Sequence, residues 1–457
     1  MTRIIRPLLF LLLAAGWLHA TGAGQTPPDA ACCGSYPQSG GAPLSADEAA
    51  GKVALLLNAG DYRELNRCYP ALRDSLPPFL RDLSEALIHY ACNRPAESNA
   101  AIDRLAAHPE ADPGTIINMH ILSFYNFRSL NDYAGAARRI GEILDELPAA
   151  EPSRSTFEAM ARWMEAFSAW PATTVRRPAQ EISVPAAIRA VGRGEQLLVD
   201  VTMNGRTRPF IFDTGCSGSN FVSEQVARQL GVRILADSIP VTGMTTLPAK
   251  VGVADSLQIG PITVLHPTFI VIPDRLMDAM PGGLDAVLGN DAMNRLDEVR
   301  IQADRGRIVF PVEQTPTPDG GPNMTFAGGQ FYLWPEYGGA PLLFHFDTGN
   351  VKSTLTDSFY AGYRREVKRQ GKKSTSTQGG FGGVKEVKVY VLPEFRLTLA
   401  GAPFALRDVT VNIREEGLAA EGEEMGSLGV DFLRAFDEVT INFRRMFVLP
   451  HNDDPFR

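Results

Sequence analysis

The chain has 457 residues, of which 44% are hydrophobic and 21% are charged, so its composition is that of a globular protein and not of a disordered or fibrous one. Its length predicts about two to four domains. The formal net charge of −8 provides no broad basic surface for phosphates, which argues against a nucleic-acid-binding protein.

Residues 1–23 have the layout of a secretory signal peptide. Two arginines precede an apolar run from Leu8 to Leu18, and small residues follow, with candidate cleavage sites after Ala20 and Ala23. The run is too short to span a bilayer comfortably, and no later segment is apolar enough to do so. We therefore expect an exported protein, periplasmic or secreted, with no integral membrane segment once the signal has been removed.

The cysteines limit the covalent chemistry of the chain. There are five of them, so at least one has no partner within the chain, although export permits disulfides and Cys68 could pair with Cys92. Cys32 and Cys33 lie well beyond the apolar run, so a lipid anchor is not expected. The chain has no Cys-x-x-Cys or His-Glu-x-x-His motif and its histidines are scattered, so we expect no metal site and no cofactor.

Residues 24–44 are rich in Pro, Gly, Ser and Ala and are expected to form a linker, whereas residues 45–170 have a helical period. A capping box begins this region at Ser45. Two Asp-Tyr pairs, at Asp61 and Asp132, open helices 71 residues apart (132 − 61), about twice the period of 34-residue helical hairpins. The region loosely resembles a tetratricopeptide-type array, and an irregular helical bundle is the alternative.

After Pro171 the pattern changes to short alternating apolar runs, β-branched residues and Gly turns, which are strand signals. Two such regions, 181–313 and 325–452, are separated by a Pro- and Gly-rich linker at 314–324. We call them lobe one and lobe two. Because the period changes sharply at Pro171, we expect few obligatory contacts between the helical region and the lobes.

The two lobes contain the same series of elements. In each lobe, an expected strand of alternating apolar and polar residues precedes a tight turn, Asn204-Gly205 or Gly338-Gly339. An apolar strand then follows and ends in Asp-Thr-Gly. The expected strands are 197–203 and 209–212 in lobe one, and 331–334 and 342–346 in lobe two. The triplets are Asp213-Thr214-Gly215 and Asp347-Thr348-Gly349, with their aspartates 134 residues apart (347 − 213).

Further landmarks follow both triplets in step. A serine lies six residues after each aspartate, at Ser219 and Ser353, and an element ending in Leu-Gly follows, at Leu288-Gly289 and Leu428-Gly429. One Asp-Thr-Gly arises by chance in roughly one of twenty chains of this length. Two of them with the same downstream landmarks indicate an internal duplication, rather than two ordinary strand-to-turn corners.

Each lobe resembles a retropepsin-type subunit of the aspartic peptidases, close to the gag-polyprotein-like aspartyl peptidases of bacteria. The resemblance covers most of residues 195–450 and leaves out the helical region. It implies an all-α module followed by two all-β acid-protease lobes that form a pseudo-dimer. It also implies that Asp213 and Asp347 are catalytic, and that Thr214, Gly215, Thr348 and Gly349 support them.

Paired aspartates suit this chemistry. Two carboxylates held close together cannot both ionise easily, so one keeps a proton while the other is charged. The charged group can take a proton from water, while the protonated group donates a hydrogen bond to the substrate carbonyl. The glycines let backbone amides approach the carboxylates without a Cβ in the way.

The resemblance also implies Gly-rich hairpin flaps over the substrate. Residues 378–383 are a good candidate in lobe two, because the glycines permit opening and Phe381 can close over a peptide. Residues 242–245 of lobe one stand at the equivalent place but are less Gly-rich, so the flaps are expected to differ. The candidate flap residues are Gly243, Met244, Gly380, Phe381 and Gly382.

Two positions depart from the pattern of this family, in which a small Ala or Ser usually follows the triplet. Here Cys216 and Asn350 follow it. A cysteine peptidase would need a histidine base near Cys216, and residues 181–313 and 325–450 contain only His266 and His345, so we interpret Cys216 as a packing residue. His345, two residues before Asp347, could bias the titration of the pair, but a structural role is expected.

The sequence thus predicts a monomeric aspartic endopeptidase that acts on a peptide or protein substrate. The alternative is a catalytically inactive protein that binds peptides with the same fold, or a protein-interaction scaffold based on the helical module. Two complete triplets count against this alternative, because binding alone does not require both.

Overall fold

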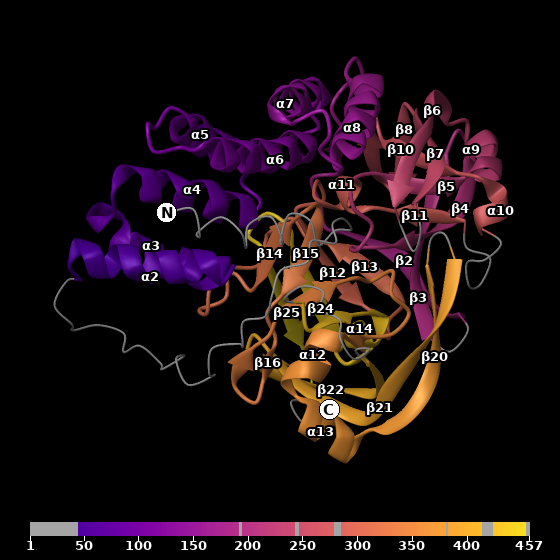
Figure 1. Cartoon of the computed structure of the whole chain (residues 1–457). Helices are drawn as coiled ribbons and strands as arrows, with labels where there is room; N and C mark the ends of the chain where they lie inside the picture. Colours follow the sequence, from indigo (N-terminus) through magenta and orange to yellow (C-terminus); the bar gives the residue numbers. More distant parts are fainter. Residues whose placement is uncertain are drawn as a thin grey trace.

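The computed structural model describes residues 44–191, 194–242, 246–277, 285–380, 383–413 and 424–453. A helical N-terminal region is followed by a β-rich region, as the sequence predicts (Figure 1). The expected signal peptide, and the expected linker up to residue 43, lie outside the described residues. Among the helices described, none combines the length and the apolar character needed to cross a bilayer.

Several helices of the N-terminal region begin directly after a residue whose side chain caps the helix. Ser45 Oγ accepts a hydrogen bond from the Glu48 amide at 3.3 Å and the Glu48 carboxylate accepts one from the Ser45 amide at 2.9 Å, which confirms the capping box. Asp61 and Asp132 also cap helices, as predicted. The helices are α2 (Ala46–Asn58), α3 (Tyr62–Leu72), η2 (Arg73–Ser75), α4 (Pro78–Ala91), α5 (Pro95–Ala106), α6 (Pro113–Leu130), α7 (Tyr133–Glu146) and α8 (Arg154–Phe167).

A disulfide between Cys68 and Cys92, which the sequence left open, is not formed. Both residues are free thiols, Cys68 half-buried and Cys92 buried. Burial raises the pKa of both thiols, so these two cysteines serve as small apolar side chains in the helical core.

Lobe one is built on a hairpin whose turn was predicted correctly. Met203 pairs with Arg206 across Asn204 and Gly205, whose φ angles are +50° and +74°, values suited to a two-residue turn. Its elements are β2 (Ile182–Val191), β3 (Gly194–Met203), β4 (Arg206–Phe212), β5 (Asn220–Ser223), α9 (Glu224–Leu230), β6 (Arg233–Thr242), β7 (Thr246–Val253), β8 (Ser256–Ile259), β9 (Ile262–Leu265), β10 (Thr268–Ile272), α10 (Asp274–Met277), β11 (Ala286–Leu288), α11 (Asn290–Met293), β12 (Glu298–Gln302) and β13 (Arg307–Phe310), and β1 (Thr174–Arg176) pairs with β9.

Lobe two repeats this order, with shorter strands around its first turn. Its predicted Gly338-Gly339 turn joins two-residue strands, and both glycines have positive φ, at +58° and +85°. Its elements are β14 (Met324–Ala327), β15 (Gln330–Leu333), β16 (Glu336–Tyr337), β17 (Ala340–Pro341), β18 (Phe344–Phe346), β19 (Thr354–Leu355), α12 (Asp357–Gly362), α13 (Arg364–Gln370), β20 (Lys372–Gly380), β21 (Gly383–Leu399), β22 (Ala402–Asn412), β23 (Gly426–Leu428), α14 (Val430–Arg434), β24 (Glu438–Asn442) and β25 (Phe447–His451).

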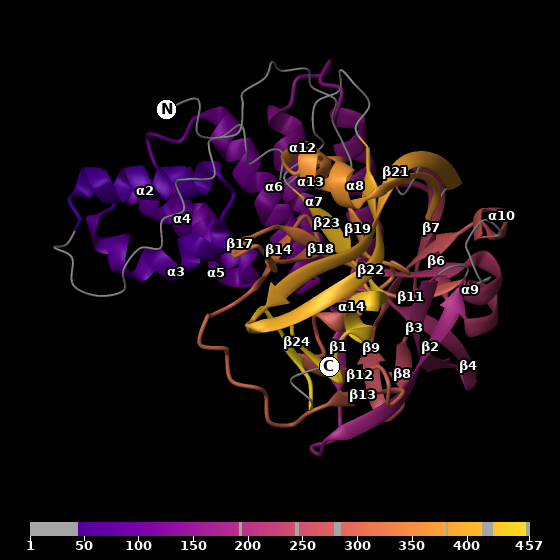
Figure 2. The ribbon, with the colours of Figure 1, turned by 90° about the horizontal axis from the view of Figure 1, so that it is seen from below.

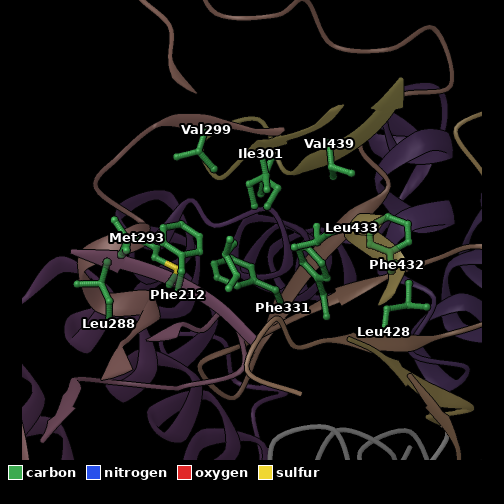
Figure 3. Close-up of a cluster of buried hydrophobic side chains, with 14 of the residues drawn as sticks. Phe212, Leu288, Met293, Val299, Ile301, Phe331, Leu428, Phe432, Leu433 and Val439 are labelled. Carbon is green, nitrogen blue, oxygen red and sulfur yellow. The ribbon is translucent and has the colours of Figure 1, made fainter. Parts of the chain in front are cut away.

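The two lobes share a sheet and a core. Strands β25, β24, β12 and β13 lie side by side in that order, with β12 and β24 antiparallel and Val299 opposite Ile441. Behind this sheet, apolar side chains of both lobes form one cluster. Figure 3 shows Phe212 and Leu288 of lobe one on one side of it, and Leu428 of lobe two on the other.

The expectation of few contacts between the helices and the lobes is wrong. A single apolar cluster combines the helical core with residues of β6, β7, β14 and β15, among them Val251 and Tyr332, which are buried. Figures 1 and 2 both show the helices gathered on one side of the β region. The change of period at Pro171 marks a change in local structure, but the apolar faces on either side of it pack on each other.

Candidate active site

Each aspartate is placed by a strand that runs parallel to its neighbour. β4 ends at Phe212 beside β11, and the Asp213 amide donates to the Leu288 carbonyl at 3.2 Å. β18 lies beside β23 in the same way, and the Asp347 amide donates to the Leu428 carbonyl at 3.0 Å. The landmarks that follow both triplets in the sequence therefore build the same arrangement in both lobes.

The glycines that end these elements allow close packing behind each loop. A Cβ on Gly289 would overlap the Ser219 carbonyl, and a Cβ on Gly429 would come within 2.5 Å of the Asn350 carbonyl. The Gly429 amide donates to Ser353 Oγ at 2.9 Å, so one of the two matched serines, both of which are buried, helps to fix this packing.

The two Asp-Thr-Gly loops bind each other through their threonines. The Thr214 amide donates to Thr348 Oγ1, and the Thr348 amide donates to Thr214 Oγ1, each at 3.0 Å. Each hydroxyl in turn donates to a carbonyl of the other lobe, Thr214 Oγ1 to Phe346 at 2.7 Å and Thr348 Oγ1 to Phe212 at 2.5 Å. Both threonines are fully buried, so these four hydrogen bonds hold the loops together away from water.

The loops bring the two carboxylates together. A Cβ on Gly215 would overlap the Asp347 carboxylate, and a Cβ on Gly349 would overlap that of Asp213, so each acid lies against the glycine of the other triplet. The Gly215 amide donates to Asp213 Oδ1 at 2.8 Å, and the Gly349 amide donates to Asp347 Oδ1 at 3.0 Å. The structure thus joins the six residues of the two triplets, which are the core of the predicted site.

In this environment the carboxyl groups of Asp213 and Asp347 cannot easily both be ionised. Burial raises the pKa of Asp213 well above its ordinary value, and the neighbouring charge of Asp347 and a hydrogen bond with it raise this pKa further. The amides of Gly215 and Cys216 oppose the shift. The pair can therefore keep one proton under conditions where an isolated aspartate would be charged.

Lobe two adds further ionisable groups beside Asp347. His345 Nδ1 lies 3.8 Å from Asp347 Oδ2, and His345 Nε2 is hydrogen-bonded to Gln330 Oε1. Burial raises the pKa of Glu424, which is partly buried; the neighbouring His345 lowers this pKa and the charge of Asp347 raises it. His345 was considered from the sequence alone, but nothing in the sequence pointed to Glu424, which lies near the dyad only through the fold.

Cys216 has the environment of a packing residue. Its thiol donates to the Ser219 carbonyl at 3.4 Å. Burial, together with the charges of Asp213 and Asp347, raises its pKa well above the ordinary value, which is the opposite of what a thiolate nucleophile requires. The geometry gives no support to the cysteine-peptidase alternative.

Both lobes carry a long hairpin at the place where a flap is predicted. In lobe one Thr242 of β6 pairs with Thr246 of β7, and in lobe two Gly380 of β20 pairs with Gly383 of β21. The candidate flap residues at the hairpin tips, Gly243, Met244, Phe381 and Gly382, lie outside the described residues. Gly380 is described, as the last residue of β20.

Two residues that the sequence analysis missed support the loop of lobe one. Asn290 accepts a hydrogen bond from the Gly218 amide at 3.1 Å, and its side-chain amide donates to the Gly329 carbonyl of lobe two. Arg128 of α6 lies against Gly218 so closely that a Cβ there would overlap its guanidinium, which stacks 5.1 Å from the Trp163 ring. Asn290 directly follows Gly289, so its position beside a matched element was a usable signal, whereas Arg128 had none.

Within the part of the chain that the structure describes, no group of His, Cys, Asp or Glu side chains is arranged to bind a metal ion.

Comparison with known proteins finds similarity over part of the chain. No curated protein matches the sequence. Three similar solved structures are conglutin gamma, a basic 7S globulin from lupine seeds (11% identity, 59% of this chain and 94% of that chain, TM-score 0.38), the protein edgp (10%, 60% and 94%, 0.37), and a retropepsin-like aspartic protease from Rickettsia conorii (20%, 31% and 92%, 0.20). Residues 199–292, which include Asp213 and Gly289, match a family model described as aspartyl protease.

Proposed function

We propose that the protein is an aspartic endopeptidase, in which Asp213 and Asp347 activate water for hydrolysis of a peptide bond. The observation that carries the proposal is the reciprocal exchange between the loops: Thr214 and Thr348 bind each other, and each carboxylate lies against the glycine of the other triplet. An arrangement that only terminates two strands has no need to hold two carboxylates in contact, since their repulsion destabilises the fold.

The proposed reaction uses the single proton of the pair. Asp213, whose pKa is raised, holds the proton and donates a hydrogen bond to the carbonyl oxygen of the scissile bond. The Asp347 carboxylate takes a proton from the attacking water. The amides of Gly349 and Asn350, which donate to Asp347 Oδ1 at 3.0 and 3.1 Å, keep this carboxylate oriented during the transfer.

The proposal extends to the rest of the molecule. The two lobes form a pseudo-dimer within one chain, so the enzyme acts as a monomer. The substrate is a peptide or protein segment that lies between the hairpins β6–β7 and β20–β21. The N-terminal residues 1–23 export the enzyme to the periplasm or the medium, where neither a cofactor nor a metal is required.

The decisive experiment replaces each aspartate by its near-isostere. Asp213→Asn and Asp347→Asn should each lower the cleavage of a diverse peptide mixture by roughly 10²–10⁴-fold, because each removes one half of the proton-transfer pair. Cleavage products are measured by mass spectrometry, with and without an inhibitor that mimics the transition state of aspartic peptidases. Asp200→Asn, an exposed position on β3, is the matched control and should retain full activity.

If Asp213→Asn or Asp347→Asn still cleaves peptides and shows a normal thermal unfolding curve, the two aspartates are not the catalytic pair. Peptide binding without any cleavage by the wild-type chain would instead favour the inactive peptide-binding protein that the sequence left as the alternative.

A further inference from the structure

The residues from each triplet aspartate to the matched serine form two corresponding loops, which we call loop one (213–219) and loop two (347–353). Loop two is fixed by its own lobe. Ser353 donates its amide and its hydroxyl to Asp431 Oδ1, at 2.8 and 2.6 Å, and Asp431 lies in α14. Both members of this pairing therefore belong to lobe two.

In lobe one the matched residues have other partners. Ser219 Oγ lies 3.0 Å from Thr268 Oγ1, which in turn donates to Asp291 Oδ2 at 3.4 Å. Asp291 is the counterpart of Asp431, and its Oδ1 accepts a hydrogen bond at 2.6 Å from Asn131, directly after α6. Figure 1 shows α11, the short helix of Asp291, next to the helical region. The carboxylate that fixes loop two in its own lobe is thus bound by the helical region in lobe one.

Gly218 of loop one is held from two sides. Its amide donates to Asn290 Oδ1 at 3.1 Å. A Cβ on Gly218 would overlap the guanidinium of Arg128, so this side chain of α6 fills the space in which a larger residue would place its own. The guanidinium lies 5.1 Å from the centre of the Trp163 ring of α8, and two further rings of α6 lie at 5.7 and 6.0 Å. These rings give the cation a fixed place against the loop.

A short turn connects Gly218 to Asp213. The Cys216 amide donates to the Asp213 carbonyl at 3.3 Å, and the Cys216 carbonyl accepts a hydrogen bond from the Asn290 amide at 3.0 Å. Only Ser217 separates this turn from Gly218. A shift at Gly218 therefore reaches Asp213 over a few bonds.

Lobe two has different residues at the corresponding positions. Lys352 stands in the place of Gly218, and Val430 in the place of Asn290. Val430 is buried and apolar, so its side chain offers no acceptor to loop two. The contacts that Arg128 and Asn290 make with loop one thus stand where lobe two has its serine–aspartate pairing.

We propose that the helical region positions the loop of Asp213, with Arg128 as the positioning residue that packs against Gly218. This inference rests on the proposed function, because the place of the loop matters for cleavage only if Asp213 acts on the substrate. A misplacement of about 1 Å in a reacting group can lower a rate by about two orders of magnitude. Lobe two fixes its loop with its own residues, whereas lobe one receives this constraint from α6.

The first test removes the positioning side chain. Arg128→Ala should lower kcat for a cleaved peptide roughly tenfold and leave KM within about threefold, because loop one carries a reacting group. The matched control is Arg233→Ala on β6, whose guanidinium lies 4.8 Å from the Trp170 ring, a similar contact between lobe one and the helical region. It should change kcat by less than about twofold. Arg128→Met, which keeps the stem over the rings, replaces Arg128→Ala if that variant does not fold. A normal unfolding curve with unchanged kcat would overturn the inference.

A double-mutant cycle tests the contact itself. Gly218→Ala places a methyl group where the guanidinium lies, and Arg128→Ala frees that space. The loss of kcat caused by Gly218→Ala should therefore be at least about threefold smaller in the Arg128→Ala background. The strain of alanine at the φ of +93° is common to both backgrounds and cancels in the comparison. Equal losses in the two backgrounds would contradict the proposed contact.

Hydrogen exchange, followed by mass spectrometry, separates this inference from the proposed function because it requires no activity. In Arg128→Ala the amides of residues 216–221 should exchange at least about fivefold faster than in the wild type, whereas those of residues 350–355 should be unchanged. Faster exchange at 216–221 without cleavage by the wild type would overturn the peptidase and support the positioning role. Cleavage by the wild type, with unchanged kcat and exchange in Arg128→Ala, would support the peptidase and overturn the positioning role. The absence of both cleavage and faster exchange would overturn the two together.

Discussion

At the scale of single residues, the threonines decide how far apart the aspartates lie. Thr214 and Thr348 each use their amide and their hydroxyl on the other lobe, so neither loop can shift without breaking buried hydrogen bonds. The carboxylates are thereby held in contact despite the burial that opposes their charge. The raised pKa of Asp213 is the electrostatic result of this constraint.

The raised pKa makes stability depend on pH in a definite direction. Between the ordinary value of about 4 and the raised value, the folded protein binds a proton at Asp213 that the unfolded chain releases. The stabilising contribution of this proton is complete below pH ~4 and is lost as the pH rises through the raised pKa. Asp213→Asn does not titrate, so its free energy of unfolding should increasingly exceed that of the wild type from pH 4 to pH 7, by up to about 1.4 kcal/mol for each pH unit.

Thermal unfolding of both proteins across this pH range measures the effect as a widening difference between their melting temperatures. Asp200→Asn, whose side chain is exposed, should follow the wild type at every pH. A constant difference between Asp213→Asn and the wild type would show that the pKa of Asp213 is not raised by folding.

The aspartates, threonines and glycines could be predicted because their spacing is a local property of the chain that occurs twice. Arg128 and Glu424 could not be assigned in this way, and Asn290 had only its place after Gly289 as a signal. Each acts on a residue distant in the sequence, as Arg128 does on Gly218, and such a contact exists only after helices and lobes have packed.

At the scale of elements, the C-terminal end of α6 is the main polar link between the helical region and lobe one. Asn131, buried and with a φ of +55°, donates to Asp291 Oδ1 at 2.6 Å. Asn131 Oδ1 accepts hydrogen bonds from Arg295 Nε at 3.0 Å and from the Thr173 amide at 3.1 Å. One side chain thus satisfies three groups that belong to α11, the following turn and the start of the β region.

Asn131→Gly should destabilise the protein by roughly 2–4 kcal/mol, because it leaves the buried Asp291 without its closest donor. Asn131→Ala should cost about 1 kcal/mol more, since alanine disfavours the positive φ that glycine accepts. Urea unfolding of the three proteins gives both differences. Unfolding free energies within about 0.5 kcal/mol of the wild type would show that the link is not structural.

The elements themselves were largely accessible from the sequence. The capping box at Ser45 and the turn at Asn204-Gly205 are read correctly because a few adjacent residues determine them. The pairing of β12 with β24 was not predicted. The residue pattern of each of these strands does not specify which strand it pairs with. The register is selected only when the two lobes pack together.

At the scale of the whole molecule, the helical region contributes to the apolar core of the β region. It covers Val251 and Val253 of β7 and Leu343 and Tyr332 of lobe two, all of them buried in a cluster shared with the helices. We therefore expect a chain that lacks residues 24–170 to be insoluble or unfolded, because its exposed apolar surface invites aggregation.

Soluble yield and near-ultraviolet circular dichroism measure this outcome. Supplying the helical region as a separate chain should restore solubility, which serves as the control. A truncated chain that is soluble and cleaves short peptides would show that the shared cluster is dispensable.

The presence of both triplets in one chain predicts how the site behaves on dilution. The lobes are covalently joined and share a core, so each meets its partner at high effective concentration. Specific activity should stay constant as the enzyme is diluted, and a mixture of Asp213→Asn and Asp347→Asn chains should stay inactive. Activity measured across a dilution series tests the first expectation, and recovery on mixing would reveal sites formed between chains.

The sheet that crosses the lobes also sets when the molecule can be completed. β24 lies 140 residues after its partner β12 (438 − 298). A growing chain thus exposes the unpaired edge of β12 throughout the synthesis of lobe two. The joint sheet closes only when β24 emerges, so the packing of the two lobes is completed by the last part of the chain to be made. For the proposed peptidase, we expect this order of synthesis to delay activity until the last strands are made.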